Sequence, residues 1–263
     1  MSLHDELLEL ATTTARSAAR LIESGAARGV EVAATKSSSV DVVTESDRSA
    51  ERLIRRTLLD ARPDDAVLGE EGDDQPGTSG VRWIVDPIDG TVNFLYGIPH
   101  YAVSIAASVD GEPVAGVVHA PLLSRTYAAR KGGGAFRDER RIHVSGRRPE
   151  QAIVATGFPF RRKELLPVYE PAFGAALHRF EDIRRVGGAS LDLCWTAEGV
   201  FDGYFELRLG PWAVAAGGII VREAGGVVSD WAGDASDWLI SGDIIAGPPD
   251  VHAVLAEIVS AGD

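Results

Sequence analysis

Cysteine, clustered histidine, basic charge and long apolar runs are all scarce in this chain. Its only cysteine, Cys194, has apolar neighbours, so an intrachain disulfide is excluded and a nucleophilic role is not expected. The six histidines are scattered and lack the spacing of zinc ligands. No apolar stretch is long enough to cross a membrane, and the N-terminus does not have the pattern of a signal peptide. These absences predict a cytoplasmic protein.

Acidic side chains outnumber basic ones. Asp and Glu total 39 against 26 Lys and Arg, which gives a formal net charge of −13. Such an excess disfavours nucleic acid and anionic membranes as partners, because both carry the same sign of charge. It is compatible with a protein that gathers acids around metal ions and acts on a small molecule, although solubility alone also accounts for most of the charge.

The most informative segment is a short acidic turn. Asp86 follows an apolar strand of residues 83–85, and Pro87 is expected to end that strand because it has no N–H for the ladder. Asp89 shares the same tight turn, and residues 90–91 are expected to begin a short helix. Two carboxylates with a carbonyl between them suit Mg²⁺, and helix N-terminal amides suit a phosphate. Dipeptides of this kind are also ordinary structural turns.

A second acidic group lies upstream. Glu70 and Glu71 follow the apolar residues 67–68 and have a glycine on each side. Adjacent glutamates repel each other, so this placement is costly unless a cation lies nearby. Ligands bind at the carboxyl ends of strands in α/β sheets, and both acidic groups are expected at such ends.

The pattern of apolar residues predicts helices and strands throughout. A helix over 3–24 and a helix after Thr44, capped with the help of Asp47, precede strands over 66–130, with a hairpin at 110–111. Residues 134–150 are charged and are expected to be irregular. A second α/β unit then follows, with helices predicted over 165–180, 190–199, 212–224 and 249–260. We expect one domain over 1–263, with halves 1–150 and 151–263.

Several ordered motifs resemble those of the inositol monophosphatase family over nearly the whole chain. The resemblance rests on Lys36, Asp41, Thr44 and Asp47; on Gly69-Glu70-Glu71; on Asp86-Pro87-Ile88-Asp89-Gly90-Thr91 with Asn93-Phe94; on 132–136; on Gly187, Ala189 and Leu191-Asp192; and on Trp212, 215–217 and 223–226.

The resemblance implies an α/β (α+β) fold, a layered αβαβα sandwich shared with fructose bisphosphatases. It implies Mg²⁺-dependent hydrolysis of a phosphate monoester, with two or three ions, lithium inhibition and a homodimer. Acid ligands suit Mg²⁺ and disfavour zinc. Metal ions offset the charge of the phosphate and acidify a water, so no Ser, Cys or His nucleophile is needed.

The resemblance also implies a role for individual residues. It assigns the first metal to Glu70, Asp86 and the carbonyl of Ile88; the second metal to Asp86 and Asp89; the orientation of the attacking water to Glu70 and Thr91, with Asp47 supporting Thr91; the phosphate to the amides of Gly90 and Thr91; and the alcohol part of the substrate to Asp89, Gly187, Gly188, Ala189 and Glu206.

One position departs from the family. The family has Trp-Asp, with the Asp as a ligand of the second metal, where this chain has Trp212 and Ala213. Glu206 and Glu223 are too far along the chain to be an obvious replacement. The residue was either changed deliberately, which the otherwise intact site favours, or is a natural variant. We predict that the second metal binds poorly and that turnover is impaired, while phosphate still binds.

The substrate stays open between several phosphate esters. We expect myo-inositol monophosphate or a related polyol phosphate, because the Glu206 carboxylate accepts hydrogen bonds from hydroxyl groups and repels a second phosphate. Histidinol phosphate, fructose 1,6-bisphosphate and a nucleotide 3′-phosphate are the alternatives within the family. A non-catalytic binding or regulatory protein on the same fold is the alternative from another class, favoured by Ala213.

Overall fold

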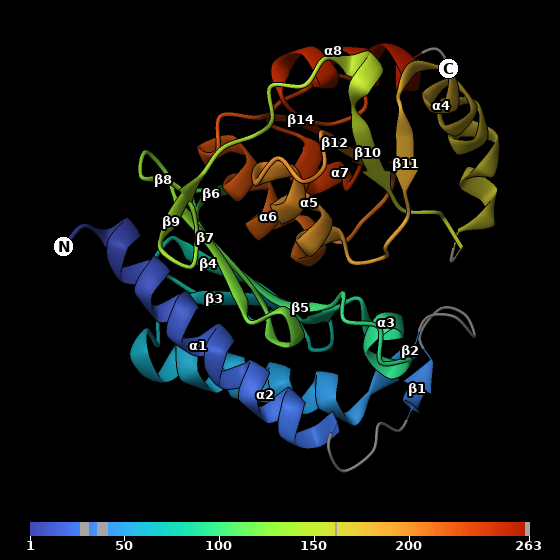
Figure 1. Cartoon of the computed structure of the whole chain (residues 1–263). Coiled ribbons are helices and arrows are strands. Elements are labelled where there is room, and N and C mark those ends of the chain that lie inside the picture. Colours follow the sequence, from blue (N-terminus) through green and yellow to red (C-terminus); the bar gives the residue numbers. More distant parts are fainter. Residues whose placement is uncertain (27–31, 36–41, 161, 261–263) are drawn as a thin grey trace.

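The described residues form two large β-sheets, a separate two-stranded sheet and three layers of helices (Figure 1). The computed structural model describes residues 1–26, 32–35, 42–160 and 162–260. The larger sheet has the order β3-β4-β5-β6-β7-β8-β9, and the smaller one has the order β11-β10-β12-β14-β13. β4 runs parallel to β3 and antiparallel to β5. The remaining two strands, β1 and β2, pair with each other.

The elements follow the predicted order closely. The helices are α1 (Leu3–Ala26), α2 (Glu45–Ala61), α3 (Thr91–Leu95), α4 (Leu166–Arg179), α5 (Ala189–Ala197), α6 (Pro211–Glu223), α7 (Trp238–Ser241) and α8 (Pro249–Ser260). The strands are β1 (Val32–Thr35), β2 (Val42–Thr44), β3 (Ala66–Gly69), β4 (Val81–Asp89), β5 (Ala102–Val109), β6 (Glu112–Ala120), β7 (Arg125–Arg130), β8 (Gly134–Arg137), β9 (Arg140–Ile142), β10 (Ile153–Thr156), β11 (Asp182–Arg184), β12 (Gly203–Glu206), β13 (Val227–Ser229) and β14 (Ile244–Gly247).

Three apolar cores correspond to the layers. α1 and α2 cover the outer face of the larger sheet, where residues such as Leu7, Ile22 and Ile54 are fully buried. α5 and α6 lie between the sheets and contribute Leu191 and Ile220 to the central core. α4 and α8 cover the outer face of the smaller sheet. The predicted αβαβα layering is therefore confirmed.

Pro87 does not end its strand, contrary to our expectation. β4 continues through it to Asp89, and its register with β5 shifts between Asp86 and Asp89. On the other side of β4, β3 ends at Gly69, which pairs with Val85, so no partner there requires an N–H from Pro87. The resulting bulge keeps both carboxylates on one strand end.

We expected residues 134–150 to be irregular, but part of this segment is regular. β8 and β9 form a hairpin whose turn residues, Asp138 and Glu139, both have positive φ. The left-handed backbone at both positions is the pattern of a tight hairpin turn, which Asp tolerates and Glu seldom adopts. The charged sequence concealed this turn.

Two residues of the family resemblance cannot be compared with the structure. Lys36 and Asp41, which contribute to the family resemblance, lie outside the described residues. Within the described part of the chain, no helix combines the length and the apolar composition needed to span a membrane.

Candidate active site

The site is built where strands of both sheets end. Asp89 ends β4 of the larger sheet, and Glu206 ends β12 of the smaller one. The two halves meet here because Asp89 Oδ2 accepts hydrogen bonds from the amide and the hydroxyl of Ser190, at 2.7 and 2.6 Å. Residues 187–189, which lead into α5, therefore lie against the acidic turn.

A capping box on α2 positions one acid of the site. The side chain of Asp47 accepts hydrogen bonds from the amide of Thr44, at 2.8 Å, and from its hydroxyl, as the sequence predicted. The hydroxyl of Thr91 lies 3.3 Å from Asp47 Oδ1 and 3.0 Å from the carbonyl oxygen of Ile88. Burial raises the pKa of Asp47 to about 6, and the charge of Glu70 adds to the rise.

The acidic turn concentrates buried negative charge. Asp86 is 2% exposed, and its Oδ1 accepts a hydrogen bond of 3.1 Å from the amide of Ile88. Burial raises the pKa of Asp86 well above its usual range, and the charges of Glu70 and Asp89 add to this rise. Both of these charges are therefore close enough to disfavour the ionisation of Asp86.

A left-handed residue turns the chain into α3. Gly90 has φ 88° and precedes Thr91, the first residue of the helix. A Cβ at Gly90 would lie 2.9 Å from the carbonyl oxygen of His100, so both space and backbone conformation require glycine. The amides of residues 90 and 91 thus lie directly beside the carboxylates.

The loop of residues 186–189, which precedes α5, is tied to α3. Asn93 Nδ2 donates to the carbonyl oxygens of His100, at 2.7 Å, and Val186, at 3.0 Å. Gly187 has φ 94°, and a Cβ at Gly188 would lie 3.5 Å from Asp89 Oδ2. Small residues at 187–189 therefore let the loop approach the acidic turn closely.

Glu206 lies on the opposite wall of the site. Burial raises its pKa to about 7, and the charges of Asp192 and Asp89 contribute further. The hydroxyl of Tyr204 donates to its carboxylate. Gly157, at the end of β10, lies against the same carboxylate and leaves no room for a Cβ.

Ala213 lies in the first turn of α6 and is 7% exposed. The carbonyl oxygen of the preceding Trp212 accepts a hydrogen bond of 3.2 Å from Ser104 Oγ. Ser104 is the cross-strand partner of Asp86 in the β4–β5 register. Ser104 therefore contacts the residue before Ala213 and is also paired with Asp86 of the acidic turn.

The structure brings together most of the residues that the sequence singled out. Asp47, Glu70, Asp86, Ile88, Asp89, Gly90 and Thr91 form one cluster, with Gly187, Gly188, Ala189 and Glu206 around it. Glu71 instead donates its amide to Glu51 Oε2, at 2.7 Å.

Sequence reasoning assigned no positioning role to the residues that hold these groups in place, although Asn93 and Asp192 belong to the motifs of the resemblance. Ser190 orients Asp89, Asn93 fixes the loop of residues 186–189, and Tyr204 orients Glu206. A buried pair of His100 and Asp192, 2.8 Å apart, lies behind Gly188. Ser190, at a predicted helix start, carried a usable signal. Tyr204 and Glu206 are two positions apart and lie on the same side of a strand, whereas the contacts of Asn93 with Val186 and of His100 with Asp192 join residues more than 90 positions apart, which no local pattern reveals.

The chemistry of the cluster fits a hard cation. Buried carboxylates whose pKa is raised by burial and by neighbouring carboxylates need either protons or a positive charge, and oxygen ligands of this type suit Mg²⁺. Among the described residues, no three or more His, Cys, Asp and Glu side chains are already grouped so as to hold a metal ion. The oxygen atoms that could bind a metal ion belong to pairs of carboxylates and to a backbone carbonyl.

Comparisons with known proteins agree with the fold. The model of the inositol monophosphatase family matches residues 3–262. An inositol-1-monophosphatase of Rhizobium meliloti (strain 1021) is 43% identical, with 83% of each chain covered. The Nus factor SuhB of Escherichia coli (strain K12) is 39% identical over 96% of this chain and 95% of its own. The crystal structure of the extragenic suppressor protein suhB from Bartonella henselae superposes with a TM-score of 0.91 at 37% identity, covering 98% of this chain and 100% of the other.

Proposed function

The chain belongs to the inositol monophosphatase family, a phosphatase family, and on this premise we propose that it is a Mg²⁺-dependent phosphate monoester hydrolase. The preferred substrate we propose is myo-inositol monophosphate or a related polyol phosphate. The observation that carries the proposal is the buried acidic turn, whose carboxylates lie directly beside the amides of Gly90 and Thr91.

The acidic turn supplies the donors for the cation. Glu70, Asp86 and the carbonyl oxygen of Ile88 would hold one Mg²⁺, and Asp86 with Asp89 would hold a second more weakly, because Ala213 offers no carboxylate. When bound, Mg²⁺ offsets the charge of the phosphate and lowers the pKa of a water.

The protein's own groups position the reactants. The amides of Gly90 and Thr91 donate to phosphate oxygens at the start of α3, which is the usual place for an anion. Asp47 accepts a hydrogen bond from the Thr91 hydroxyl, so that oxygen keeps its lone pairs for a proton of the attacking water. Glu70 would accept the other proton of that water.

Phosphate release from a panel of monoesters, with Mg²⁺ titrated, tests the proposal. The panel contains inositol 1-phosphate, glycerol 2-phosphate, histidinol phosphate, fructose 1,6-bisphosphate and a nucleotide 3′-phosphate. The protein with Asp restored at position 213 is assayed in parallel, so that weak binding of the second metal does not conceal the activity. Absence of Mg²⁺-dependent release from every ester in both proteins would contradict the proposal.

Glu206→Gln is expected to separate the candidate substrates. The substitution keeps the size of the side chain but removes the charge that strengthens the hydrogen bonds it accepts from hydroxyl groups. We therefore expect KM for a polyol phosphate to rise about tenfold, with kcat within a few-fold. A fall in kcat alone would contradict this role.

Histidinol phosphate serves as the discriminating substrate for the same variant. Its ammonium group would lose an ion-pair partner, so a KM increase confined to this ester would favour the cationic alternative. Glu198→Gln is a matched control, because Glu198 pairs with Arg137 and Tyr127 away from the acidic turn.

Protons and Mg²⁺ are expected to compete for the site. Asp47, Asp89 and Glu206 have pKa values raised to about 6, 6 and 7, so they bind protons more tightly in the folded than in the unfolded chain. Their contribution to the unfolding free energy is therefore largest below about pH 4 and is lost as pH rises through about 6–7.

Thermal unfolding with and without Mg²⁺ measures this competition. The increase in Tm caused by Mg²⁺ should be several degrees larger at about pH 8 than at about pH 5. Because Tm with and without Mg²⁺ is compared at the same pH, the effect of groups that titrate elsewhere in the protein cancels. An equal increase at both pH values would show that the acidic cluster does not bind the cation.

A second candidate function is a non-catalytic binding or regulatory protein. Ala213 favours it, and the relatives named Nus factor show that the family name alone does not exclude it. The retained carboxylates Glu70, Asp86 and Asp89 argue against it, since buried mutual repulsion has no evident benefit without a cation. Homodimer formation and lithium inhibition remain predictions from the family.

A further inference from the structure

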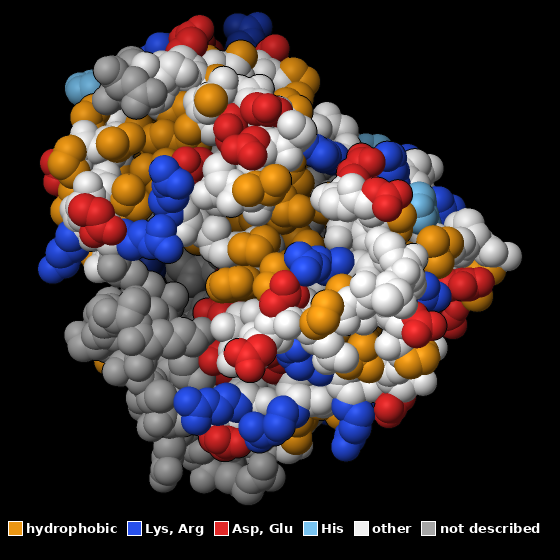
Figure 2. All heavy atoms as spheres, turned by 180° about the vertical axis from the view of Figure 1, so that it is seen from behind, with side chains coloured by type: hydrophobic (Ala, Val, Ile, Leu, Met, Phe, Trp, Pro, Cys, Tyr) orange, Lys and Arg blue, Asp and Glu red, His pale blue; other side chains and the backbone are white. Residues whose placement is uncertain are grey.

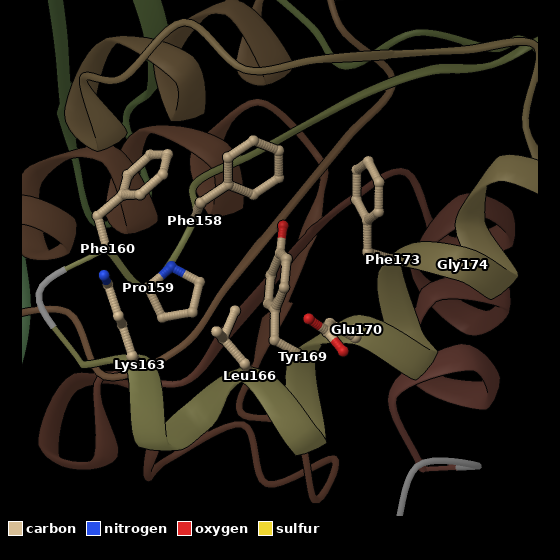
Figure 3. A pocket seen from close by; sticks show the side chains of 9 residues that line it. All are labelled: Phe158, Pro159, Phe160, Lys163, Leu166, Tyr169, Glu170, Phe173 and Gly174. Atoms are coloured by element: carbon tan, nitrogen blue, oxygen red, sulfur yellow. The ribbon is translucent and has the colours of Figure 1, made fainter.

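An aromatic cavity opens beside the proposed site, between α4 and the segment that follows β10 (Figure 3). Its volume is about 530 Å³, which is within the range of small-molecule pockets. The rings of Phe158, Phe160, Tyr169 and Phe173 face it, and Lys163 and Glu170 lie at its edge. Hydrophobic side chains with basic ones beside them also gather on the upper half of the face in Figure 2.

Phe158 packs edge to face against the neighbouring rings, and Tyr169 stacks on Phe173. The centroid of Phe158 lies 5.4 Å from that of Phe173 and 5.6 Å from that of Phe160. The Tyr169 hydroxyl is already satisfied by Thr156 Oγ1, at 2.7 Å, so its ring presents an apolar surface. Aromatic edges and faces arranged in this way favour a further ring as a neighbour.

The cavity is kept open at a cost in helix stability. Gly174 lies inside α4 without a positive φ, and no heavy atom lies within 4 Å of the position of a Cβ. Glycine in a helix interior costs roughly 0.5–1 kcal/mol relative to alanine. Packing does not require glycine here, whereas a larger side chain would take up free space beside the cavity.

The cavity adjoins the alcohol side of the proposed site. Gly157 lies against the Glu206 carboxylate, and the next residue, Phe158, forms a wall of the cavity. The Arg185 guanidinium lies 5.2 Å from the centroid of Phe160 and also close to Gly187. The charge of Glu206 also acts on Tyr169, another residue of the cavity wall, so the cavity begins close to this carboxylate.

We propose that this cavity binds an aromatic group carried by the alcohol part of the phosphate ester. The proposal rests on the proposed function and specifies its substrate class: an ester whose leaving alcohol extends past Glu206 and ends in an apolar ring. The occupant is a small molecule, because the space is concave, apolar and open beside the phosphate site.

Equilibrium binding of phosphonates tests this directly, because their C–P bond is not hydrolysed. Phenylalkylphosphonates with linkers of three to six carbons are compared with 3,4-dihydroxybutylphosphonate by calorimetry in Mg²⁺. We expect one linker length to bind at least about tenfold tighter than the polyol analogue, from burial of one ring. Gly174→Phe should remove this advantage, and Phe173→Ala should reduce it.

Gly146→Phe is the matched control, because Gly146 is exposed and has equally open space, but does not line the cavity. Circular dichroism and solution mass accompany each variant. No phenyl advantage at any linker, or an advantage that survives Gly174→Phe, overturns the proposal. A change of oligomeric mass in Gly174→Phe without a change in phosphonate affinity assigns the cavity to a second copy and also overturns it. Failure of both phosphonate classes to bind instead refutes the proposed function, and the substrate role of the cavity with it.

Discussion

Ala213→Asp is expected to raise the Mg²⁺-dependent phosphatase activity by roughly 100-fold or more. A metal ion contributes several kcal/mol of transition-state stabilisation, and each 1.36 kcal/mol is worth a factor of ten in rate. In the present chain, Asp86 and Asp89 are the two carboxylates proposed for the second ion, and a third would complete its donors. The gain should appear in kcat and in a lower Mg²⁺ concentration for half-maximal activity.

The position of residue 213 supports this expectation. It lies in the first turn of α6, where a carboxylate is favoured by the helix amides. Ser104 joins this turn to Asp86, through the carbonyl oxygen of Trp212 on one side and the β4–β5 register on the other. An aspartate here would therefore add its charge next to the acidic turn rather than on a remote surface.

Ala213→Asn is the control, because asparagine has the size of aspartate without its charge. It should leave activity within a few-fold of the unaltered chain. Equal activity of the Ala and Asp forms at millimolar Mg²⁺ would show that another group completes the second metal site. If neither form hydrolyses any of the esters, the result favours the alternative of a non-catalytic binding protein.

Local chemistry accounts for the parts of the site that the sequence predicted correctly. The capping box of Thr44 and Asp47, the helix start at Thr91 and the acidic end of β4 each depend on residues within a few positions. Pro87 misled the prediction because its effect depends on where the neighbouring strand ends. That information belongs to β3 and is not local.

Contacts across long stretches of chain explain the rest. Asp89 and Ser190 are 101 positions apart, and their hydrogen bonds join the two halves of the site. The aromatic cavity likewise depends on how α4 packs beyond the end of β10, which the spacing of Phe158, Tyr169 and Phe173 did not indicate. Local patterns specified the acidic turn, whereas tertiary packing shaped the surface that we propose selects the alcohol.

Asp86→Asn is expected to abolish activity and, at the same time, to stabilise the metal-free protein. The asparagine side chain would keep an oxygen to accept the hydrogen bond from the amide of Ile88, but the substitution would remove one charge from a set of buried carboxylates. Relief of this repulsion should raise the unfolding free energy by about 1–3 kcal/mol at pH 8, or Tm by about 2–4 °C per kcal/mol. In the Ala213→Asp background, phosphate release should fall by about a thousandfold or more.

Asp65→Asn provides the contrast for this prediction, because Asp65 is also 2% exposed but has cationic and neutral partners. It accepts hydrogen bonds from Arg62, at 2.6 Å, and from Trp83 Nε1, at 2.9 Å. Removing its charge breaks a compensated buried pair and should lower Tm. Thermal unfolding in EDTA measures both variants, and Mg²⁺ should raise Tm for Asp65→Asn but hardly for Asp86→Asn. A lower Tm for Asp86→Asn in EDTA would mean that the acidic turn is stabilising without a cation, and the argument for a metal site would lose its main support.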